Sequence, residues 1–278
     1  MKKWVLFCCL VIVIFVLYDT NKTQEFAHLE LPSLHSQNAL LLNEQGDVLY
    51  EKNADAIIYP ASLTKIMTAI VAIEMTDDLQ MQTIVKPQTI AKYTAQNASM
   101  AGFHAGDFVT IEDLLYGTLL ASGADATATL AEAIAGSEDE FVTYMNNKAQ
   151  ELGMDATHII NTSGLHDEAH VSSLQDMSKL LRYALENPTF YQIFTSKAYT
   201  THVPTELLIA NSLFTRMPSM DGTIFGGKTG YTPEAGLCLA SLMEKDRRKF
   251  LFITTNAPGY AWTPPPHIED ALTAYDAL

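Results

Sequence analysis

Apolar residues repeat along the chain with two different periods, and the strand-like pattern is confined to its two ends. Five segments are typical of β-strands, because they are short, mostly apolar or glycine-rich, and bounded by turn residues: 39–42, 48–52, 226–230, 236–243 and 250–255. Residues 43–47 separate the first two and predict a hairpin, while the charged residues 244–248 separate the last two. The pattern therefore predicts a sheet to which both ends of the chain contribute.

The residues between these strands follow helical spacing. Apolar residues recur at intervals of three and four over most of four stretches: 62–75, 111–135, 138–152 and 174–186. A short helix over 267–278 is expected after the last strand. Helices enclosed between terminal strands favour an antiparallel sheet flanked by a helical subdomain, with a cleft at their junction. The predicted fold class is therefore α/β, of the α+β kind.

The helical stretch 111–135 contains a break. Thr110 is typical of a helix N-cap, with an acidic residue, Asp113, at the third helical position. Residues 121–125 then interrupt the apolar pattern, and the helix resumes with Asp125 as its predicted N-cap. Ser122 is therefore expected in a turn between two helices.

The N-terminal residues are typical of a targeting signal. Lys2 and Lys3 precede the uncharged, mostly apolar stretch 4–18, which is shorter than the roughly 20 residues of a transmembrane helix and fits a signal h-region. No small-x-small cleavage site follows it, and Cys8 and Cys9 lie inside the apolar run. We expect an uncleaved signal-anchor that leaves the folded part outside the cytoplasm, with a cleaved signal as the alternative.

The length and composition of the rest of the chain predict a single folded domain after this signal. We assign residues 1–25 to the signal-anchor and the start of a tether, and residues 26–278 to one folded domain. The polar residues 20–37 predict a tether and not a folded element. About 240 residues are enough for a single large core. Cys238 is the only cysteine in this part of the sequence, which predicts a buried thiol and no disulfide within the domain.

The net charge of the chain limits the classes of molecule that it is expected to bind. The sequence has 278 residues and a formal net charge of -15 at pH 7, which disfavours nucleic acid or an anionic membrane surface as the main partner. A local cleft can still be positive, since the whole-chain charge does not describe it. No cofactor is expected.

Ser62 and Lys65 form the first candidate for chemistry. They are three residues apart at the start of a predicted helix, so their side chains share one face. A serine hydroxyl needs an adjacent base, and a lysine serves as that base only if burial, positive charge or a helix N-terminus lowers its pKa. The spacing indicates nucleophilic catalysis, with a surface lysine on an ordinary helix as the alternative.

Lys228, Thr229 and Gly230 form the second candidate, in a glycine-rich predicted strand. Glycine inside a strand often marks a close approach by another backbone or by a ligand. A lysine ammonium and a threonine hydroxyl suit the recognition of a carboxylate. The alternative is a β-hairpin whose glycines serve only the turn.

The third candidate, Ser122-Gly123-Ala124, is ambiguous alone, because a serine in a helix–helix turn needs no functional explanation. Its place between the other two changes the interpretation. Ser-x-x-Lys, a serine in a helical break and Lys-Thr-Gly, in this order, are typical of penicillin-binding proteins and class A β-lactamases.

Other residues with catalytic chemistry are mostly set aside. His166, Asp167, Glu168 and His170 lie close together in the sequence but lack the His-Glu-x-x-His spacing of zinc peptidases, so no metal site is expected. The same loop also lacks the Glu-x-x-Leu-Asn pattern that a class A β-lactamase requires for deacylation. Arg216 is a possible further ligand for a carboxylate, which its sequence neighbourhood does not decide.

Over residues 38–255 the chain resembles the serine D-alanyl-D-alanine carboxypeptidases, the low-molecular-weight penicillin-binding proteins of cell-wall synthesis. The similarity extends beyond the catalytic letters to five segments: 59–69, 113–117, 145–154, 161–165 and 227–232. The resemblance implies the β-lactamase/D,D-peptidase-like fold for the folded domain. It also implies a peptidoglycan stem peptide ending in D-Ala-D-Ala as substrate, and β-lactams as covalent inhibitors.

The resemblance also implies roles for individual residues. Ser62 attacks the carbonyl between the two D-alanines and forms an acyl-enzyme. Lys65 accepts the proton of Ser62, and Ser122 relays a proton to the leaving amine. The backbone N–H groups of Ser62 and Tyr231 form the oxyanion hole.

The third motif is implied to bind the substrate. Lys228 and Thr229 recognise the terminal carboxylate beside Gly230 and Tyr231, and Lys228 also helps to lower the pKa of Lys65.

One position departs from the family pattern. Ala124 stands where the family has an asparagine that hydrogen-bonds the substrate. A missing neutral hydrogen bond costs about 0.5–1.5 kcal/mol, roughly two- to tenfold in rate. Two alternatives to a carboxypeptidase therefore stay open: a non-hydrolytic relative that binds penicillin or stem peptides, and a D,D-transpeptidase or endopeptidase.

Overall fold

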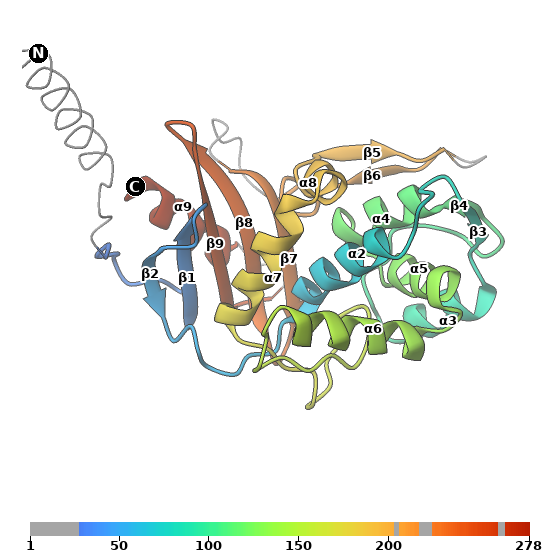
Figure 1. Cartoon of the computed structure of the whole chain (residues 1–278), viewed down its shortest axis with the longest axis horizontal. Helices are drawn as coiled ribbons and strands as arrows, with labels where there is room; N and C mark the ends of the chain where they lie inside the picture. The colour runs from blue at the N-terminus through green and yellow to red at the C-terminus, as the bar shows by residue number, and fades with distance from the viewer. Residues whose placement is uncertain (1–27, 203–205, 217–223, 261–264) are drawn as a thin grey trace, which may run out of the picture.

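Strands from the two ends of the chain form one antiparallel sheet. The computed structural model describes residues 28–202, 206–216, 224–260 and 265–278. The sheet has the order β2-β1-β9-β8-β7, and each neighbouring pair is antiparallel (Figure 1). This confirms the five-stranded sheet predicted from the sequence. Its strands are β1 (Asn38–Asn43), β2 (Val48–Lys52), β7 (Ile224–Thr232), β8 (Gly236–Lys245) and β9 (Arg248–Ala257).

Helices cover both faces of this sheet. Helix α9 (Pro266–Asp276) packs on β8 and β9, and α7 (Leu174–Glu186) packs on β1 and β9. Successive strand residues point to opposite faces, so Leu41 joins the α9 cluster while Leu40 joins the core shared with the other helices. The sheet is therefore buried on both sides, which explains its nearly continuous apolar strands.

The helical subdomain is organised around α2 (Lys65–Glu74), which directly follows the short 3-10 helix η1 (Ala61–Thr64). The first eight residues of α2 are all buried, because other helices surround it (Figure 1). These are α4 (Ile111–Leu119), α5 (Ala124–Ala135), α6 (Glu138–Glu151), α7 and α8 (Pro188–Phe194). Lys65, at the first position of α2, is thus carried into the interior by the packing of the whole helix.

Several short elements were not predicted from the sequence. They are α3 (Pro87–Ala95), α8, and two small sheets formed by β3 (Gln82–Ile84) with β4 (Phe108–Thr110) and β5 (Ala198–Thr200) with β6 (Leu208–Ala210). A strand of three residues is too short to show a period, so the hydrophobic pattern contains little information about it.

The residues before β1 correct the predicted tether. From Leu29, whose backbone N–H donates to the Leu49 carbonyl at 2.7 Å, the segment packs against the domain. Ser36 donates to the Asp270 carboxylate of α9 from its backbone N–H at 2.8 Å and from its hydroxyl at 2.6 Å. The tether prediction is therefore wrong for the described residues 28–37, because a buried acid fixes them. Residues 20–27 and the apolar stretch 4–18 lie outside the described residues.

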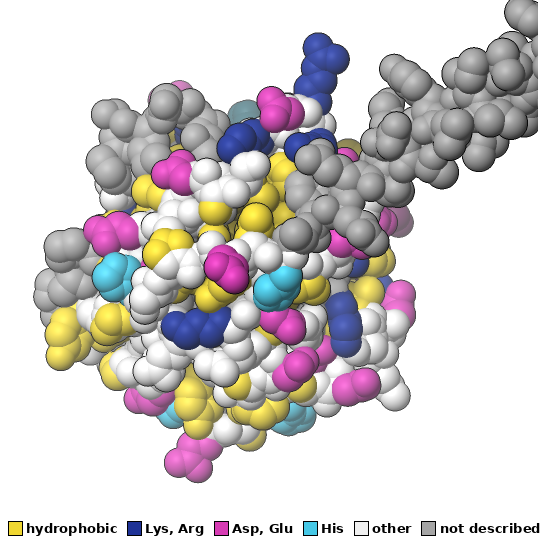
Figure 2. Space-filling model, turned by 90° about the vertical axis from the view of Figure 1, so that its left-hand side faces the viewer, with side chains coloured by type: hydrophobic (Ala, Val, Ile, Leu, Met, Phe, Trp, Pro, Cys, Tyr) yellow, Lys and Arg dark blue, Asp and Glu magenta, His cyan; other side chains and the backbone are white. Residues whose placement is uncertain are grey.

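The surface at the β2 edge of the sheet carries acidic, basic and apolar side chains without a continuous basic patch among its described residues (Figure 2). This agrees with the acidic composition of the chain. Among the described helices, none combines the length and the apolar character needed to cross a bilayer.

Candidate active site

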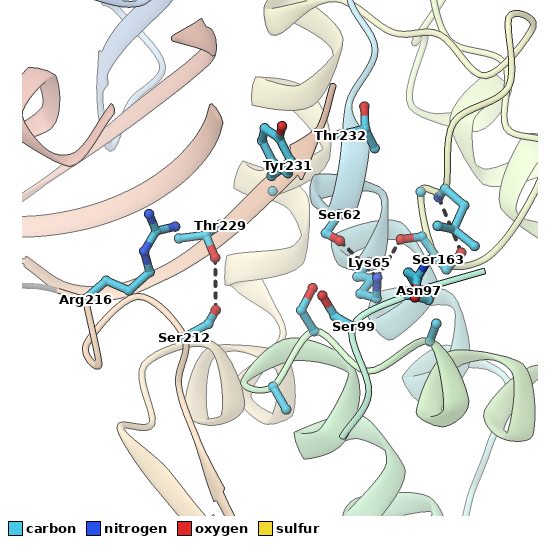
Figure 3. Close-up of a pocket in the computed structure, with 17 residues that line it drawn as sticks. Ser62, Lys65, Asn97, Ser99, Ser163, Ser212, Arg216, Thr229, Tyr231 and Thr232 are labelled. Carbon is cyan, nitrogen blue, oxygen red and sulfur yellow. Dashed lines mark hydrogen bonds between the residues drawn. The ribbon is translucent and has the colours of Figure 1, made fainter. Parts of the chain in front are cut away.

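Ser62 and Lys65 meet where η1 passes into α2. The Nζ atom of Lys65 lies 3.0 Å from the Ser62 hydroxyl and donates a hydrogen bond to it (Figure 3). The predicted pair is therefore in hydrogen-bonding contact. When Lys65 is neutral, the same contact lets the serine donate its proton to the amine, which is the arrangement that a nucleophile and its base require.

The surroundings of Lys65 make it a suitable base. The side chain is 2 % exposed, and its Nζ also donates to the Ser163 carbonyl at 2.5 Å. Burial lowers the pKa of Lys65 to about 7, against a smaller opposing effect of the Asp125 carboxylate. A large fraction of Lys65 is therefore neutral near neutral pH, although a solvated lysine is almost fully charged there.

A loop over 161–165 holds Ser163 against the nucleophile turn. The Asn161 side-chain oxygen accepts the backbone N–H groups of Ser163 and Gly164 at 3.2 and 2.8 Å. A Cβ atom placed on Gly164 would lie 1.8 Å from the Ala61 carbonyl oxygen. Only glycine allows the loop to approach η1 so closely, and this approach brings the Ser163 carbonyl to Lys65.

Ser122 lies in the turn between α4 and α5, as predicted. Its φ of +63° is in the left-handed region, which is strained for a serine, and its hydroxyl accepts a hydrogen bond from Lys228 Nζ at 2.8 Å. The prediction that Asp125 caps α5 is wrong. Gly123 is the N-cap, while Asp125 lies in the first turn and accepts the Ala101 backbone N–H at 2.7 Å.

Lys228 lies behind the cleft and does not line it. Its side chain is 1 % exposed and also donates to the Thr229 carbonyl at 2.8 Å. Burial, and secondarily the charge of Lys65, hold the pKa of Lys228 well below its ordinary value. The structure therefore places Lys228 against Ser122 and leaves the cleft surface of this motif to the residues that follow it.

The cleft has a volume of about 420 Å³. Thr229, Gly230, Tyr231 and Thr232 of β7 line one side of it, with the Thr229 hydroxyl 2.9 Å from that of Ser212. Arg216 lines the same end as Thr229 (Figure 3). The lining residues include Lys65 and Arg216 but no carboxylate, so the cleft of this acidic protein suits an anionic ligand.

The wall opposite β7 contains two residues that the sequence analysis missed. Asn97 and Ser99, in the loop after α3, line the cleft together with Ala124 (Figure 3). The Ser99 carbonyl accepts the Ala124 backbone N–H at 2.7 Å, which joins this loop to the start of α5. No motif letter marks these residues, since the loop reaches the cleft through tertiary packing.

His166 and His170 pack against the residues around the nucleophile turn. His170 is 2 % exposed, and its Nε2 lies 3.0 Å from the Thr64 hydroxyl in η1. His166 packs edge-on against Tyr59. Within the described ranges, no three histidine, cysteine or acidic side chains are placed so that they could hold a metal ion.

Comparison with known proteins identifies relatives over most of the chain. The sequence model of the D-alanyl-D-alanine carboxypeptidase family matches residues 23–259. The D-alanyl-D-alanine carboxypeptidase DacF of Bacillus subtilis is 34 % identical over 248 residues, which cover 87 % of this chain and 61 % of the relative. DacC of Escherichia coli is 33 % identical and is covered to 56 %. The chain thus spans less than two thirds of the length of these two relatives.

Solved structures agree with these relatives. The crystal structure of a Streptomyces DD-transpeptidase superposes with a TM-score of 0.82 at 28 % identity, covering 90 % of this chain and 98 % of that one. A D-alanyl-D-alanine carboxypeptidase from Mycobacterium tuberculosis superposes with a TM-score of 0.78 at 28 % identity. The fold of this chain is therefore shared with these solved structures.

Proposed function

Because the chain belongs to the D-alanyl-D-alanine carboxypeptidase family, we propose that it removes the terminal D-alanine from peptidoglycan stem peptides through an acyl-enzyme on Ser62. The observation that carries this proposal is the contact of 3.0 Å between Ser62 and Lys65, a lysine whose pKa burial lowers to about 7. A lysine that serves only to hold the fold has no need to be partly neutral beside a serine at the edge of an open cleft.

Acylation begins when neutral Lys65 takes the proton of Ser62. The serine oxygen attacks the carbonyl carbon between the two D-alanines, and the resulting oxyanion faces the backbone N–H groups of Ser62 and Tyr231. A Cβ atom on Gly230 would lie 3.1 Å from the Ser62 nitrogen, so β7 approaches the nucleophile turn closely enough to frame one oxyanion site. Each such donor contributes about 3 kcal/mol to lowering the barrier.

The leaving group departs as D-alanine with a neutral amino group and its carboxylate still ionised. The carbon–nitrogen bond breaks, its electron pair stays on nitrogen, and Ser122 passes a proton from the lysines to this nitrogen. The hydrogen bond of 2.8 Å from Lys228 to Ser122 supports this role. Water then attacks the acyl-enzyme, with its proton taken by Lys65, and Ser62 is regenerated.

The terminal carboxylate is bound at the end of the cleft where Thr229, Ser212 and Arg216 lie. The Thr229 and Ser212 hydroxyls are 2.9 Å apart and both face the cleft. Arg216 supplies the positive charge at this end, while buried Lys228 acts through its hydrogen bond to Ser122. A β-lactam presents its carboxylate and strained carbonyl in a similar relation and acylates Ser62 by the same route.

Transpeptidation is the second candidate function. A structural neighbour that this chain covers to 98 % of its length is a DD-transpeptidase. Ala124 also lacks the side-chain amide with which the family holds the acyl chain. Both reactions share the acyl-enzyme and differ in whether water or an amine resolves it. A non-hydrolytic binding role is less well supported, because two buried lysines paired with Ser62 and Ser122 are costly to maintain for binding alone.

We also propose that the reaction takes place outside the cytoplasmic membrane, with residues 4–18 as an N-terminal signal-anchor. The support is the sequence pattern of Lys2 and Lys3 before an apolar stretch, and the location of peptidoglycan itself.

The test is release of D-alanine by the full-length protein from diacetyl-Lys-D-Ala-D-Ala, with Ser62→Ala as the inactive control. We expect release that depends on Ser62, and covalent labelling of Ser62 by benzylpenicillin. Added amine acceptors, such as glycylglycine, measure the share of transpeptidation. No release and no labelling from folded protein would remove the acyl-transfer function, while product only in the presence of an acceptor would replace hydrolysis by transpeptidation.

A further inference from the structure

The loop after α3 places an uncommitted side-chain amide at the catalytic cleft. Asn97 is the only residue with a side-chain amide among those that line the cavity. It is exposed, and within the described part of the chain its side chain makes no hydrogen bond. The amide is therefore available to a ligand.

The position of this loop is fixed relative to the middle motif. The backbone N–H of Ala124 donates to the Ser99 carbonyl at 2.7 Å, and the Ala101 N–H donates to the Asp125 carboxylate at 2.7 Å. Both acceptor and donor belong to the segment directly after Asn97. The loop is thus anchored to the same helix start at which the family carries its asparagine.

Ala124 leaves that place without a polar side chain. It is 1 % exposed and packs in a small apolar cluster with Tyr93 and Ala128. Its short side chain cannot hydrogen-bond a ligand, although the residue lies at the cavity wall. Asn97 lies at the same wall, two residues before the Ser99 carbonyl that contacts Ala124.

The two ends of the cleft give the substrate a direction. Arg216, Thr229 and Ser212 lie at one end, Asn97 and Ser163 lie at the other, and Ser62 lies between them (Figure 3). A peptide whose terminal carboxylate binds at the first end extends past Ser62 toward the second. The amide group on the acyl side of the scissile bond then lies toward the end of the cleft that Asn97 lines.

We propose that Asn97 supplies the side-chain amide that Ala124 lacks, and that it hydrogen-bonds the acyl-side amide group of the substrate. This inference rests on the proposed function of the cleft as an acyl-transfer site. It makes Asn97 a substrate-binding and specificity-determining residue for peptides and for β-lactams that carry an acylamino side chain.

A backbone role for Asn97 is the competing explanation. The residue directly follows the C-cap of α3 and has a φ of +50°, a position where asparagine is tolerated and glycine is preferred. Glycine therefore separates the two roles. Asn97→Gly keeps or improves the backbone conformation and removes only the amide.

The first experiment compares full-length Asn97→Gly with the unmodified protein. We expect kcat/KM for D-alanine release to fall by about two- to tenfold, the effect of one lost hydrogen bond, with Tm unchanged or higher. Asn53→Gly is the matched control, since Asn53 has a φ of +49° but is not among the cavity-lining residues. We expect it to leave kcat/KM unchanged.

The second measurement tests the identity of the contact. Benzylpenicillin carries an acylamino group that 6-aminopenicillanic acid lacks, so the ratio of their acylation rates reports on recognition of this group. We expect Asn97→Gly to lower this ratio, and Ala124→Asn to restore it in the double variant. A purely structural change at the loop affects both β-lactams alike.

The outcomes separate this inference from the function on which it rests. An active, penicillin-labelled protein in which Asn97→Gly changes neither kcat/KM nor the acylation ratio overturns the role of Asn97 and leaves the enzyme intact. A parent protein that shows neither release nor labelling overturns both. A lower ratio with an unchanged Tm supports the proposed contact.

Discussion

The two walls of the cleft are built in different ways. One wall consists of η1 and β7, which carry the Ser-x-x-Lys and Lys-Thr-Gly motifs, and two backbones approach closely there at Gly164 and Gly230. The other wall consists of the loop around Asn97 and the turn at Ser122, where the motif departs at Ala124. Both walls are held by backbone contacts, which on the second wall include the hydrogen bond from the Ala124 N–H to the Ser99 carbonyl. They differ in what they present to a ligand: the first wall offers backbone groups beside the nucleophile, and the second offers side chains from a loop and a strained turn.

This difference indicates which groups of the site can be supplied from another segment of the chain. A backbone approach such as that of Gly164 to the Ala61 carbonyl leaves no room for another residue. A side-chain amide, in contrast, can be supplied from any segment that reaches the same space. The missing asparagine side chain at Ala124 therefore lies on the wall where another segment can supply an amide.

Lys65→Ala is expected to have the largest effect, because it removes the base from the motif-matched wall. General-base catalysis contributes about 10²- to 10⁴-fold, so we expect acylation of Ser62 to slow by about that factor. Stopped-flow or mass-spectrometric acylation by benzylpenicillin measures it. Lys52→Ala, a lysine at the distant edge strand β2, serves as the control, and equal rates in the two variants would contradict the assignment.

Gly164→Ala tests whether the first wall depends on its backbone. The new Cβ atom meets the Ala61 carbonyl oxygen at 1.8 Å, so the loop must move and take the Ser163 carbonyl away from Lys65. A displacement of about 1 Å costs on the order of 100-fold in rate. Gly153→Ala is the control, since Gly153 also has a positive φ of +64° but nothing within 4 Å of the added atom. We measure Tm and kcat/KM for both variants. If only Gly164→Ala loses activity, the cause is the close approach to Ala61 and not the positive φ.

Ser122→Gly tests whether the second wall depends on a side chain held in a strained turn. It removes the proton relay, which we expect to lower kcat by about 100-fold, and it relieves a left-handed serine, which we expect to stabilise the fold by about 1 kcal/mol. Chemical denaturation and steady-state kinetics measure the two effects. Ser122→Ala keeps the strain, so a variant pair of equal stability would show that no strain is stored there.

The pH dependence of the reaction reports on Lys65 directly. Lys65 acts when it is neutral, and burial lowers its pKa to about 7. We therefore expect kcat/KM to be constant above this pH and to fall about tenfold for each unit below it. A profile that stays flat down to pH 5, with substrate and Tm unchanged, would exclude Lys65 as the base.

The sequence predicted the first wall more completely than the second. Ser62 with Lys65, and Thr229 to Tyr231, are close in sequence, so local spacing was enough to bring their side chains to one place. Asn97 and Ser212 are far in sequence from the motifs, and only the packing of α3 on α5 and the turn after β6 carries them to the cleft. Local patterns contain no information about such contacts.

The same reason accounts for the errors in the fold. The terminal strands and long helices have enough residues to show their period, and they were predicted to within a few positions. The segment before β1 lacks a period and is ordered by the buried carboxylate of Asp270, more than two hundred residues away in the chain. Asp125 is a residue type that often caps helices, but its carboxylate accepts the backbone N–H of Ala101 from another loop instead.

Ser212 joins the two walls and is expected to give the smallest effect. Its backbone N–H donates to the Leu120 carbonyl at 2.9 Å on the second wall, and its hydroxyl lies 2.9 Å from that of Thr229 on the first. Ser212→Ala keeps the backbone bond and removes one neutral ligand of the substrate carboxylate. We expect KM to rise by about two- to fivefold with kcat unchanged, measured by D-alanine release over a range of substrate concentrations. Thr143→Ala, which removes an exposed hydroxyl on α6 away from the cavity-lining residues, is the control. A fall in kcat instead would mean that the contact between the Ser212 and Thr229 hydroxyls positions the reacting groups. The two walls would then depend on each other for catalysis.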